Sequence, residues 1–429
     1  MNKNIKLAVA GAILATASVA NAGIIIPAGD WTLDVSGNVN SYMNWTKADG
    51  RATVQSAYSL DTGAGTNSSI NQGNGLLPNF LSVGGTTRQN DLDVSFVISL
   101  QPGTAASTPI GDVSSGGNGG LNNRQSFITF GDKSWGSVKV GKDLGIFASD
   151  AILSDMTLLG VGALAAGGNT TLGRIGYGYI YADWKPQFAY TTPNMGGFQA
   201  TVGLTQAMDA TSRVGSNSTD VVSGAGGNNA GVGYEAKASY GFDANGVTGK
   251  VWASGIAQKI ASLGAGYTLT DTVSRAGDIG ANLNVAGFGL TGYYYAGQGI
   301  GTMGQQLDGI GGASKATLGQ RDSNGGYVQA TYILPTKTKA GISWGVSQLD
   351  LANGETSATM STGGGAAIPI ANAGRSTLIK ENRMTTVGLY HPLTKHLNLV
   401  AEYSHITSEN QAGAENKAHS TNLGAILFF

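Results

Sequence analysis

Cysteine is absent from the 429-residue sequence, which excludes disulfides and thiolate metal sites. Charge is scarce as well, at 12% of the residues, and basic and acidic side chains nearly balance to a net charge of −1. Nucleic-acid binding would need a clear basic excess, so that class of function finds no support. No apolar run reaches the roughly 20 residues of a membrane-spanning helix. If this protein lives in a membrane, it must cross the bilayer without helices.

The N-terminus has the features of an export signal. Lys3 and Lys6 precede an apolar stretch, and Ala20-Asn21-Ala22 offers the small residues of a cleavage site. We therefore expect residues 1–22 to be a signal peptide and residues 23–429 to form the mature protein. A chain of this length ordinarily suggests two or three domains, but a large barrel can take all of it as one.

The body of the sequence alternates between apolar and polar residues. In the segment 92–100 every even position is apolar, whereas the odd positions include Asp93, Ser95 and Ser99. The same period of two recurs near 198–205, 232–240, 328–334 and 397–403. Each segment is about ten residues long, which fits a strand that crosses a membrane at a tilt. A soluble sandwich would alternate too, so the connections have to decide.

The connections fall into two kinds. Short turns are predicted at 87–90, 132–135, 194–196, 243–245, 286–287, 336–338 and 394–396. Longer loops rich in Gly, Ser and Asn are predicted at 46–75, 102–122, 143–184, 209–229, 299–322, 351–380 and 408–418, with a shorter one near 259–273. This division gives sixteen strands with both chain ends on the short-turn rim. It predicts an all-β fold, a transmembrane antiparallel barrel of the bacterial outer-membrane type.

The loop at 143–184 is far longer than the connections of a compact soluble domain, where loops above roughly 15 residues are uncommon unless they serve a function. A wide barrel offers this loop a place inside its lumen. We expect it to fold inward and narrow the channel. Its apolar stretch Leu158–Ala166 is expected to pack on the inner wall, because irregular backbone exposed to lipid would leave polar groups unpaired.

Three stretches resemble the Gram-negative general porins. The first is the hairpin Arg124-Gln-Ser-Phe-Ile-Thr-Phe-Gly-Asp-Lys-Ser-Trp-Gly-Ser-Val-Lys-Val-Gly-Lys142; the others are the turn segment Tyr190–Phe198 and the terminal Phe429. The resemblance implies a trimer of sixteen-stranded barrels in the outer membrane, in contact with its lipid and lipopolysaccharide. The third loop would form a charged constriction for passive diffusion of small hydrophilic solutes and ions, and no cofactor is implied.

The resemblance also implies the residues of the constriction. Arg124 falls where the family places a basic wall residue, Lys142 where it has Arg, and Arg174 where a further basic residue is common. The segment Asn79–Gly84 lacks an arginine often found there, and the loop has no Pro-Glu-Phe-Gly motif. The loop acids would then be Asp143, Asp150 and Asp155. A more ordinary interpretation pairs Asp143 locally with Lys142 and leaves some of the other acids solvated.

Other functions are weighed against a diffusion channel. A solute-specific channel is the first alternative, and a surface adhesin is the second, although no fixed repeat supports a solenoid. An enzyme would need a nucleophile or acid paired with a base, and no Gly-x-Ser-x-Gly elbow is present. His405 and His419 could form a metal pair, but surface histidines are the favoured interpretation. Glu235 and Lys237 are expected to pair with each other on the inner wall.

Overall fold

The computed structural model describes ten stretches of the chain: residues 23–49, 54, 68–104, 121–164, 170–213, 221–223, 231–260, 272–312, 318–355 and 378–429. Residues 1–22 lie outside these stretches, so the predicted signal peptide has no structural counterpart here. The loops predicted at 102–122, 209–229, 259–273 and 351–380 fall largely outside them too.

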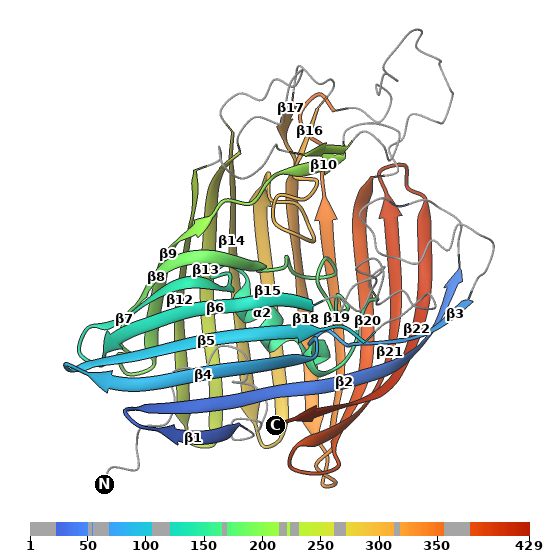
Figure 1. Cartoon of the computed structure of the whole chain (residues 1–429). Helices are drawn as coiled ribbons and strands as arrows, with labels where there is room; N and C mark the ends of the chain where they lie inside the picture. Colours follow the sequence, from blue (N-terminus) through green and yellow to red (C-terminus); the bar gives the residue numbers. More distant parts are fainter. Residues whose placement is uncertain are drawn as a thin grey trace.

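The described strands form one closed antiparallel barrel (Figure 1). Its sixteen wall strands are β2 (Trp31–Asp49), β4 (Phe80–Gln89), β5 (Leu92–Pro102), β6 (Leu121–Asp132), β7 (Gly136–Leu144), β8 (Trp184–Thr191), β9 (Phe198–Gln206), β12 (Val232–Ala244), β13 (Val247–Ile260), β14 (Thr272–Val285), β15 (Phe288–Gln298), β18 (Asp322–Ile333), β19 (Lys339–Leu349), β20 (Ile379–Pro392), β21 (Leu397–Asn410) and β22 (Glu415–Phe428). The predicted fold class and strand number are confirmed.

Closure of the barrel joins the first wall strand to the last. β2 pairs with β22 from Asn38 opposite Phe428 to Asp49 opposite Lys417. Gly37 and Phe429 then exchange two backbone hydrogen bonds, of 2.8 and 3.0 Å. Two short strands also pair with β2: β1 (Ile24–Ala28) continues the seam beyond β22, and β3 (Ser68–Gly73) lies on the other edge of β2, beyond β4. Pairing of this kind satisfies the backbone without water, as a bilayer requires.

Two small two-stranded sheets lie outside the barrel sheet: β10 (Thr211–Arg213) pairs with β11 (Val221–Ser223), and β16 (Ile310–Gly312) pairs with β17 (Leu318–Gln320). The short turns all lie on one rim of the barrel, opposite the rim of the long loops, and they include tight hairpins. Asn90 and Asp91 have positive φ angles of 49° and 63°, and Ala286 and Gly287 have 49° and 84°. Two consecutive positive φ values give the turn whose twist matches antiparallel strands. Residues such as Asn, Asp and Gly therefore fix this rim locally.

The alternation predicted from the sequence separates an apolar outer face from a filled interior. Along β15, Phe288, Leu290 and Tyr294 are more than half exposed, whereas Tyr293 and Tyr295 point inward and are buried. The interior core is formed by these tyrosines together with the segment between β7 and β8, including Phe147 and Ile180. This polypeptide therefore has its core in the lumen and its hydrophobic surface on the outside, the reverse of a soluble domain.

Candidate channel constriction

The described residues between β7 and β8, 145–164 and 170–183, lie inside the barrel, and we call them the inner loop. It contains a short helix, α2 (Ser149–Ser154), which Figure 1 labels within the ring of strands, and a 3-10 turn, η1 (Met156–Leu159). Its apolar side chains Val161 and Leu164 pack on wall residues Ile426 and Phe428. The expected inward fold of this loop and the wall contact of its apolar stretch are both present.

The first end of the inner loop is held by a wall carboxylate, Glu235 on β12. One carboxylate oxygen accepts hydrogen bonds from the backbone N–H groups of Ile146 and Phe147, each at 2.8 Å. The other oxygen accepts from Thr205 at 3.1 Å and pairs with the ammonium of Lys185. Glu235 and Lys185 are both almost fully buried. Two successive amides and one ammonium thus fix the start of the loop to β12.

The far part of the inner loop is held by a second wall carboxylate, Glu402 on β21. It accepts from the backbone N–H groups of Val161 and Gly162 at 2.8 and 2.9 Å, and from the hydroxyl of Tyr390 at 2.6 Å. The approach is so close that a Cβ at Gly160 would lie 2.0 Å from the Glu402 carboxylate. A side chain at position 160 would therefore push the Glu402 carboxylate away from the N–H groups of Val161 and Gly162.

These two anchors lie on nearly opposite sides of the barrel. Counting along the wall, β12 is the eighth strand and β21 the fifteenth of sixteen. Between the anchors, Gln329 on β18 accepts from the Met156 N–H at 2.6 Å, and Tyr327 donates to the Ala151 carbonyl at 2.8 Å. The inner loop therefore crosses the lumen and is bonded to the wall along its path.

Charged side chains in the middle of the loop are paired with the wall. Asp150, on α2, contacts Lys237 at 3.0 Å and also pairs with Lys250. Burial alone would raise the pKa of Asp150, but the two ammonium groups outweigh it and hold the pKa below its ordinary value. At the end of the loop the balance is reversed, because burial raises the pKa of Asp183 despite a backbone hydrogen bond from Trp184. Because Lys237 and Lys250 lower its pKa, Asp150 is ionised at neutral pH.

Asp155 and Arg174 meet within the loop itself. The Asp155 carboxylate accepts from the Thr157 N–H at 3.0 Å and from the Tyr179 hydroxyl at 2.9 Å. Arg174 lies 3.9 Å from the same carboxylate and donates to the Met384 carbonyl on β20 at 3.0 Å. Both side chains are fully buried. They bind the two halves of the inner loop to each other and to the wall.

A second segment also turns into the lumen. After β15, Met303 accepts from the Tyr181 N–H at 2.8 Å, and Gln305 donates to the Ala182 carbonyl at 3.0 Å. The Gln305 side chain also accepts from Lys185 at 2.5 Å. The sequence predicts only a long rim loop at 299–322, and nothing in its composition signals this inward turn. The channel is narrowed by two loops rather than one.

The remaining predicted basic residues, Arg124 and Lys142, lie away from Asp150 and Asp155 but act electrostatically on Asp183 at the end of the inner loop. Lys142 stands opposite Pro186, in the row of Val140 and the lipid-facing Phe188, so it points outward; its ammonium donates to the Asn123 carbonyl at 2.8 Å. Arg124 lies over the ring of Trp184, 5.9 Å from its centroid. The structure brings Arg174, Asp150 and Asp155 together in the inner loop but not Arg124 or Lys142.

Asp143 does face the lumen, on the inward row of β7. Its cation is Lys139, not Lys142, and its second oxygen accepts from Gln125 at 3.0 Å. The expected pair of Glu235 with Lys237 is also replaced, because Glu235 binds Lys185 and Lys237 binds Asp150. The sequence analysis missed Glu402 altogether. Its only signal is a carboxylate at an inward position of an alternating strand.

Within the described stretches, no group of three or more His, Asp or Glu side chains is arranged as a metal site. No helix in the same part of the chain is long and apolar enough to span a membrane.

Comparison with known proteins agrees with this geometry. A family model for Gram-negative porins matches residues 8–411. No curated protein sequence matches the chain. Among solved structures, the outer-membrane channel DcaP of Acinetobacter baumannii is similar with a TM-score of 0.62 at 16% identity, covering 95% of this chain and 100% of that one.

Two further porin structures are similar over almost the whole chain. The anion-selective porin of Comamonas acidovorans gives a TM-score of 0.56 at 14% identity, covering 93% of this chain and 100% of its own. OmpF of Salmonella typhi, solved with daunomycin, gives 0.57 at 15% identity, covering 95% and 100%. At such identities these structures bear on the fold alone, whereas the family match extends over most of the sequence. The chain belongs to the Gram-negative porin family.

Proposed function

We propose that this outer-membrane channel passes small hydrophilic solutes by diffusion along its inner loop and prefers anions. One observation carries the preference. The side chain of Asp150 is only 7% exposed. The two lysines that contact it, Lys237 and Lys250, remain 22% and 36% exposed. Lys139 and Asp143 repeat the pattern at 28% and 2%. Water in the lumen therefore meets ammonium groups while the carboxylates stay behind them.

The carboxylate next to Asp150, Asp278 on β14, is covered as well, because it is buried and accepts hydrogen bonds from Ser254 and Tyr293. An anion passing about 7 Å from one of the exposed ammonium groups in water gains about 0.6 kcal/mol, and a cation loses as much. Losing that charge would lower the local anion-to-cation ratio by up to roughly sevenfold at low salt, and less as salt screens it.

Reversal potential in a salt gradient across a planar bilayer tests this proposal. The wild type is expected to be anion-selective, and Lys250→Gln and Lys237→Gln each shift the potential toward cations. Lys337→Gln is the matched control, because it removes the same charge from an exposed turn on the short-turn rim. Cation selectivity in the wild type, or equal potentials in all four proteins, would overturn the preference. A reconstituted protein that carries no current would refute the channel itself.

The constriction residues implied by family resemblance remain part of the proposal. Arg174, Asp150, Asp155 and Asp143 would shape the narrow region by holding the inner loop, and Arg124 and Lys142 would act at the long-loop rim. Arg124→Glu is expected to shift the reversal potential less than Lys250→Gln, because Arg124 stacks on Trp184 rather than facing Asp150. An equal or larger shift would return Arg124 to the narrow region.

A solute-specific channel is the second candidate, favoured by the second inward segment. Met303 and Gln305 bond to the inner loop, so two loops share the lumen. Saturation of the current by one solute class at millimolar concentration would support this candidate. Conductance that scales linearly with salt, with no block by small anionic solutes, would favour the general diffusion channel.

Self-association as a homotrimer and contact with lipopolysaccharide are proposed from the same family. One similar structure, the outer-membrane protein OmpT of Vibrio cholerae, is a trimer form. Chemical cross-linking of the native protein, followed by electrophoresis without heating, is expected to show a band of three chains. The mature chain is proposed to begin at Gly23, which N-terminal sequencing of the outer-membrane form would establish.

A further inference from the structure

Two histidines lie at the centre of a row of side chains that crosses the outer wall. The register sets Trp344 opposite Thr385, Thr385 opposite His405, His405 opposite His419, and His419 opposite Lys47. Side chains directly opposite in antiparallel strands share one face of the sheet. Trp344 is 45% exposed, so that face is the outer one. The histidines therefore lie outside the lumen, on β21 and β22.

The histidine rings approach each other at one particular nitrogen. The two Nδ1 atoms are 3.2 Å apart, whereas the ring centroids are 4.5 Å apart. The rings of His405 and His419 thus lean together at these atoms. Zinc binds imidazole nitrogen at about 2.0–2.1 Å, so two such ligands at a tetrahedral centre are about 3.4 Å apart. The observed spacing is that of a hydrogen bond between the two rings, and it is also close to the spacing that one shared metal ion requires.

The outer edges of the two rings meet hydrogen-bonding groups. Asp49, on β2, places a carboxylate oxygen 3.5 Å from Nε2 of His419. The hydroxyl of Thr407 lies 3.5 Å from Nε2 of His405. A carboxylate on the far nitrogen directs the proton to Nε2 and leaves the Nδ1 lone pair for a metal. The Tyr403 hydroxyl forms a hydrogen bond of 2.7 Å with Nδ1 of His419, and a metal ion at that nitrogen would take the place of this bond.

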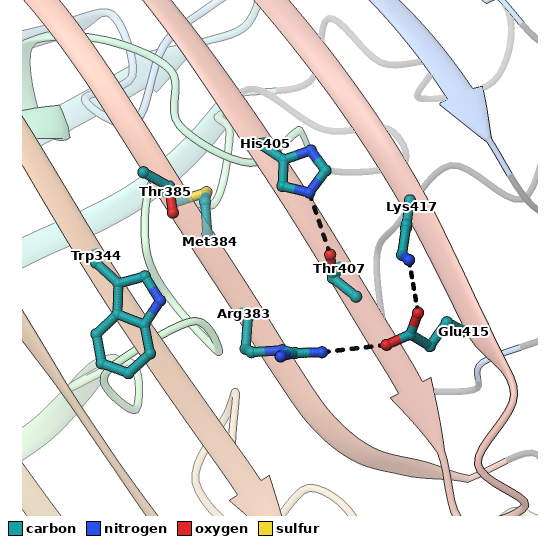
Figure 2. Close-up of a pocket in the computed structure, with 8 residues that line it drawn as sticks. All are labelled: Trp344, Arg383, Met384, Thr385, His405, Thr407, Glu415 and Lys417. Carbon is teal, nitrogen blue, oxygen red and sulfur yellow. Dashed lines mark hydrogen bonds and ion pairs between the residues drawn. The ribbon is translucent and has the colours of Figure 1, made fainter.

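A pocket of about 400 Å³ adjoins the pair on the outer wall (Figure 2). Its lining includes His405, Arg383, Lys417 and Glu415. Figure 2 shows both cations tied to Glu415, which lies 3.1 Å from Arg383 and 2.7 Å from Lys417. Glu415 offsets their repulsion of a metal ion, and Asp49 offsets that of Lys47, which lies 3.8 Å from its carboxylate. The pocket leaves room for water or another oxygen ligand to complete the coordination.

We propose that His405 and His419 together bind one divalent transition-metal ion, with zinc as the expected occupant. Their Nδ1 atoms are the two protein nitrogen ligands, and Asp49 is a positioning residue that acts through His419. Imidazole ligands select zinc, copper and nickel over magnesium and calcium, which prefer oxygen. The site lies on the outer wall near the long-loop rim, so it does not depend on what the channel conducts.

Equilibrium binding of Zn²⁺ to the purified, untagged full-length barrel tests the site. The chain has four histidines, and His391 and His396 lie toward the short-turn rim, which makes His396→Gln a matched control. The wild type and His396→Gln are expected to bind one Zn²⁺ per chain, and Mg²⁺ is not expected to compete. His405→Gln and His419→Gln are each expected to abolish this site, and Asp49→Asn to weaken it about tenfold.

Cu²⁺ provides an independent readout, because nitrogen ligation changes its visible absorption and electron paramagnetic resonance spectrum. Two nitrogen ligands are expected in the wild type and at most one in either histidine variant. Two results would overturn the proposal: Zn²⁺ binding no tighter in the wild type than in His419→Gln, or loss of binding in His396→Gln. Each variant is first checked for heat-modifiable electrophoretic migration, so that a loss of binding reports the site and not a failure to fold.

Discussion

Removing the Glu402 carboxylate should release one end of the inner loop without opening the barrel. In Glu402→Ala the backbone N–H groups of Val161 and Gly162 lose the acceptor that now lies 2.8 and 2.9 Å away. An unsatisfied buried amide costs about 1–3 kcal/mol, so two cost about 2–6 kcal/mol before water enters. Water from the lumen will re-solvate part of this, which makes about 2 kcal/mol the working figure.

A loss of about 2 kcal/mol corresponds to a rise of roughly 30-fold in the fraction of time that this end of the loop is detached. We therefore expect Glu402→Ala channels to show excess open-channel current noise and a larger mean conductance in planar bilayers. The wall strands should stay intact, because the lost contacts lie between loop and wall. Heat-modifiable migration of the folded barrel on a gel should confirm this.

Glu402→Gln is the matched control. Its side-chain oxygen can accept from both amides, and its NH2 group can donate to the Tyr390 hydroxyl oxygen, which now donates to Glu402 at 2.6 Å. The anchor is thereby kept in neutral form, and noise close to wild type is expected. If Glu402→Ala matches both wild type and Glu402→Gln in noise and conductance, Glu402 does not hold the loop.

Three further changes probe other anchors. Lys237 and Lys250 lower the pKa of Asp150, so the ionised Asp150 contributes its full stability to the loop above the ordinary Asp pKa of about 4. This stability is lost as pH falls through the lowered pKa of the folded state, and current noise should rise in that acidic range. Asp150→Asn should show the same noise at pH 7. Arg174→Leu leaves the buried Asp155 carboxylate uncompensated at a cost of about 3–5 kcal/mol. The thermal unfolding midpoint of Arg174→Leu should fall below that of the wild type, and an unchanged midpoint would contradict the pairing of Arg174 with Asp155. Glu235→Gln should raise the current noise far more than Glu402→Gln, because it removes the negative charge that pairs with the buried Lys185.

The barrel wall could be predicted because its determinants are local. A period of two fixes which side chains face out, and residues such as the Ala286-Gly287 pair mark the turns. The attachment of the inner loop is not local. Glu402 meets Val161 across 241 residues of sequence, and that meeting depends on the registers of every intervening strand. Alternation shows that Glu402 points inward but not what it will meet.

The misplacement of Lys142 has a different cause. A motif match placed it on the channel wall, but a shift of one residue in a strand exchanges the two faces. Val138 and Val140 share the outward row of β7, so Lys139 and Asp143 are the inward residues. The information was present in the sequence. Alternation within the strand is better evidence of facing than the position of a residue within a family motif.

The pair of anchors at Glu235 and Glu402 has a mechanical consequence. A cylinder built from a single sheet can flatten into an ellipse, because bending across strands breaks few hydrogen bonds. The inner loop works as a tie between nearly opposite walls, so widening along that diameter would have to pull four backbone amides from two carboxylates. The segment that narrows the passage also keeps the ring round under lateral pressure from the membrane.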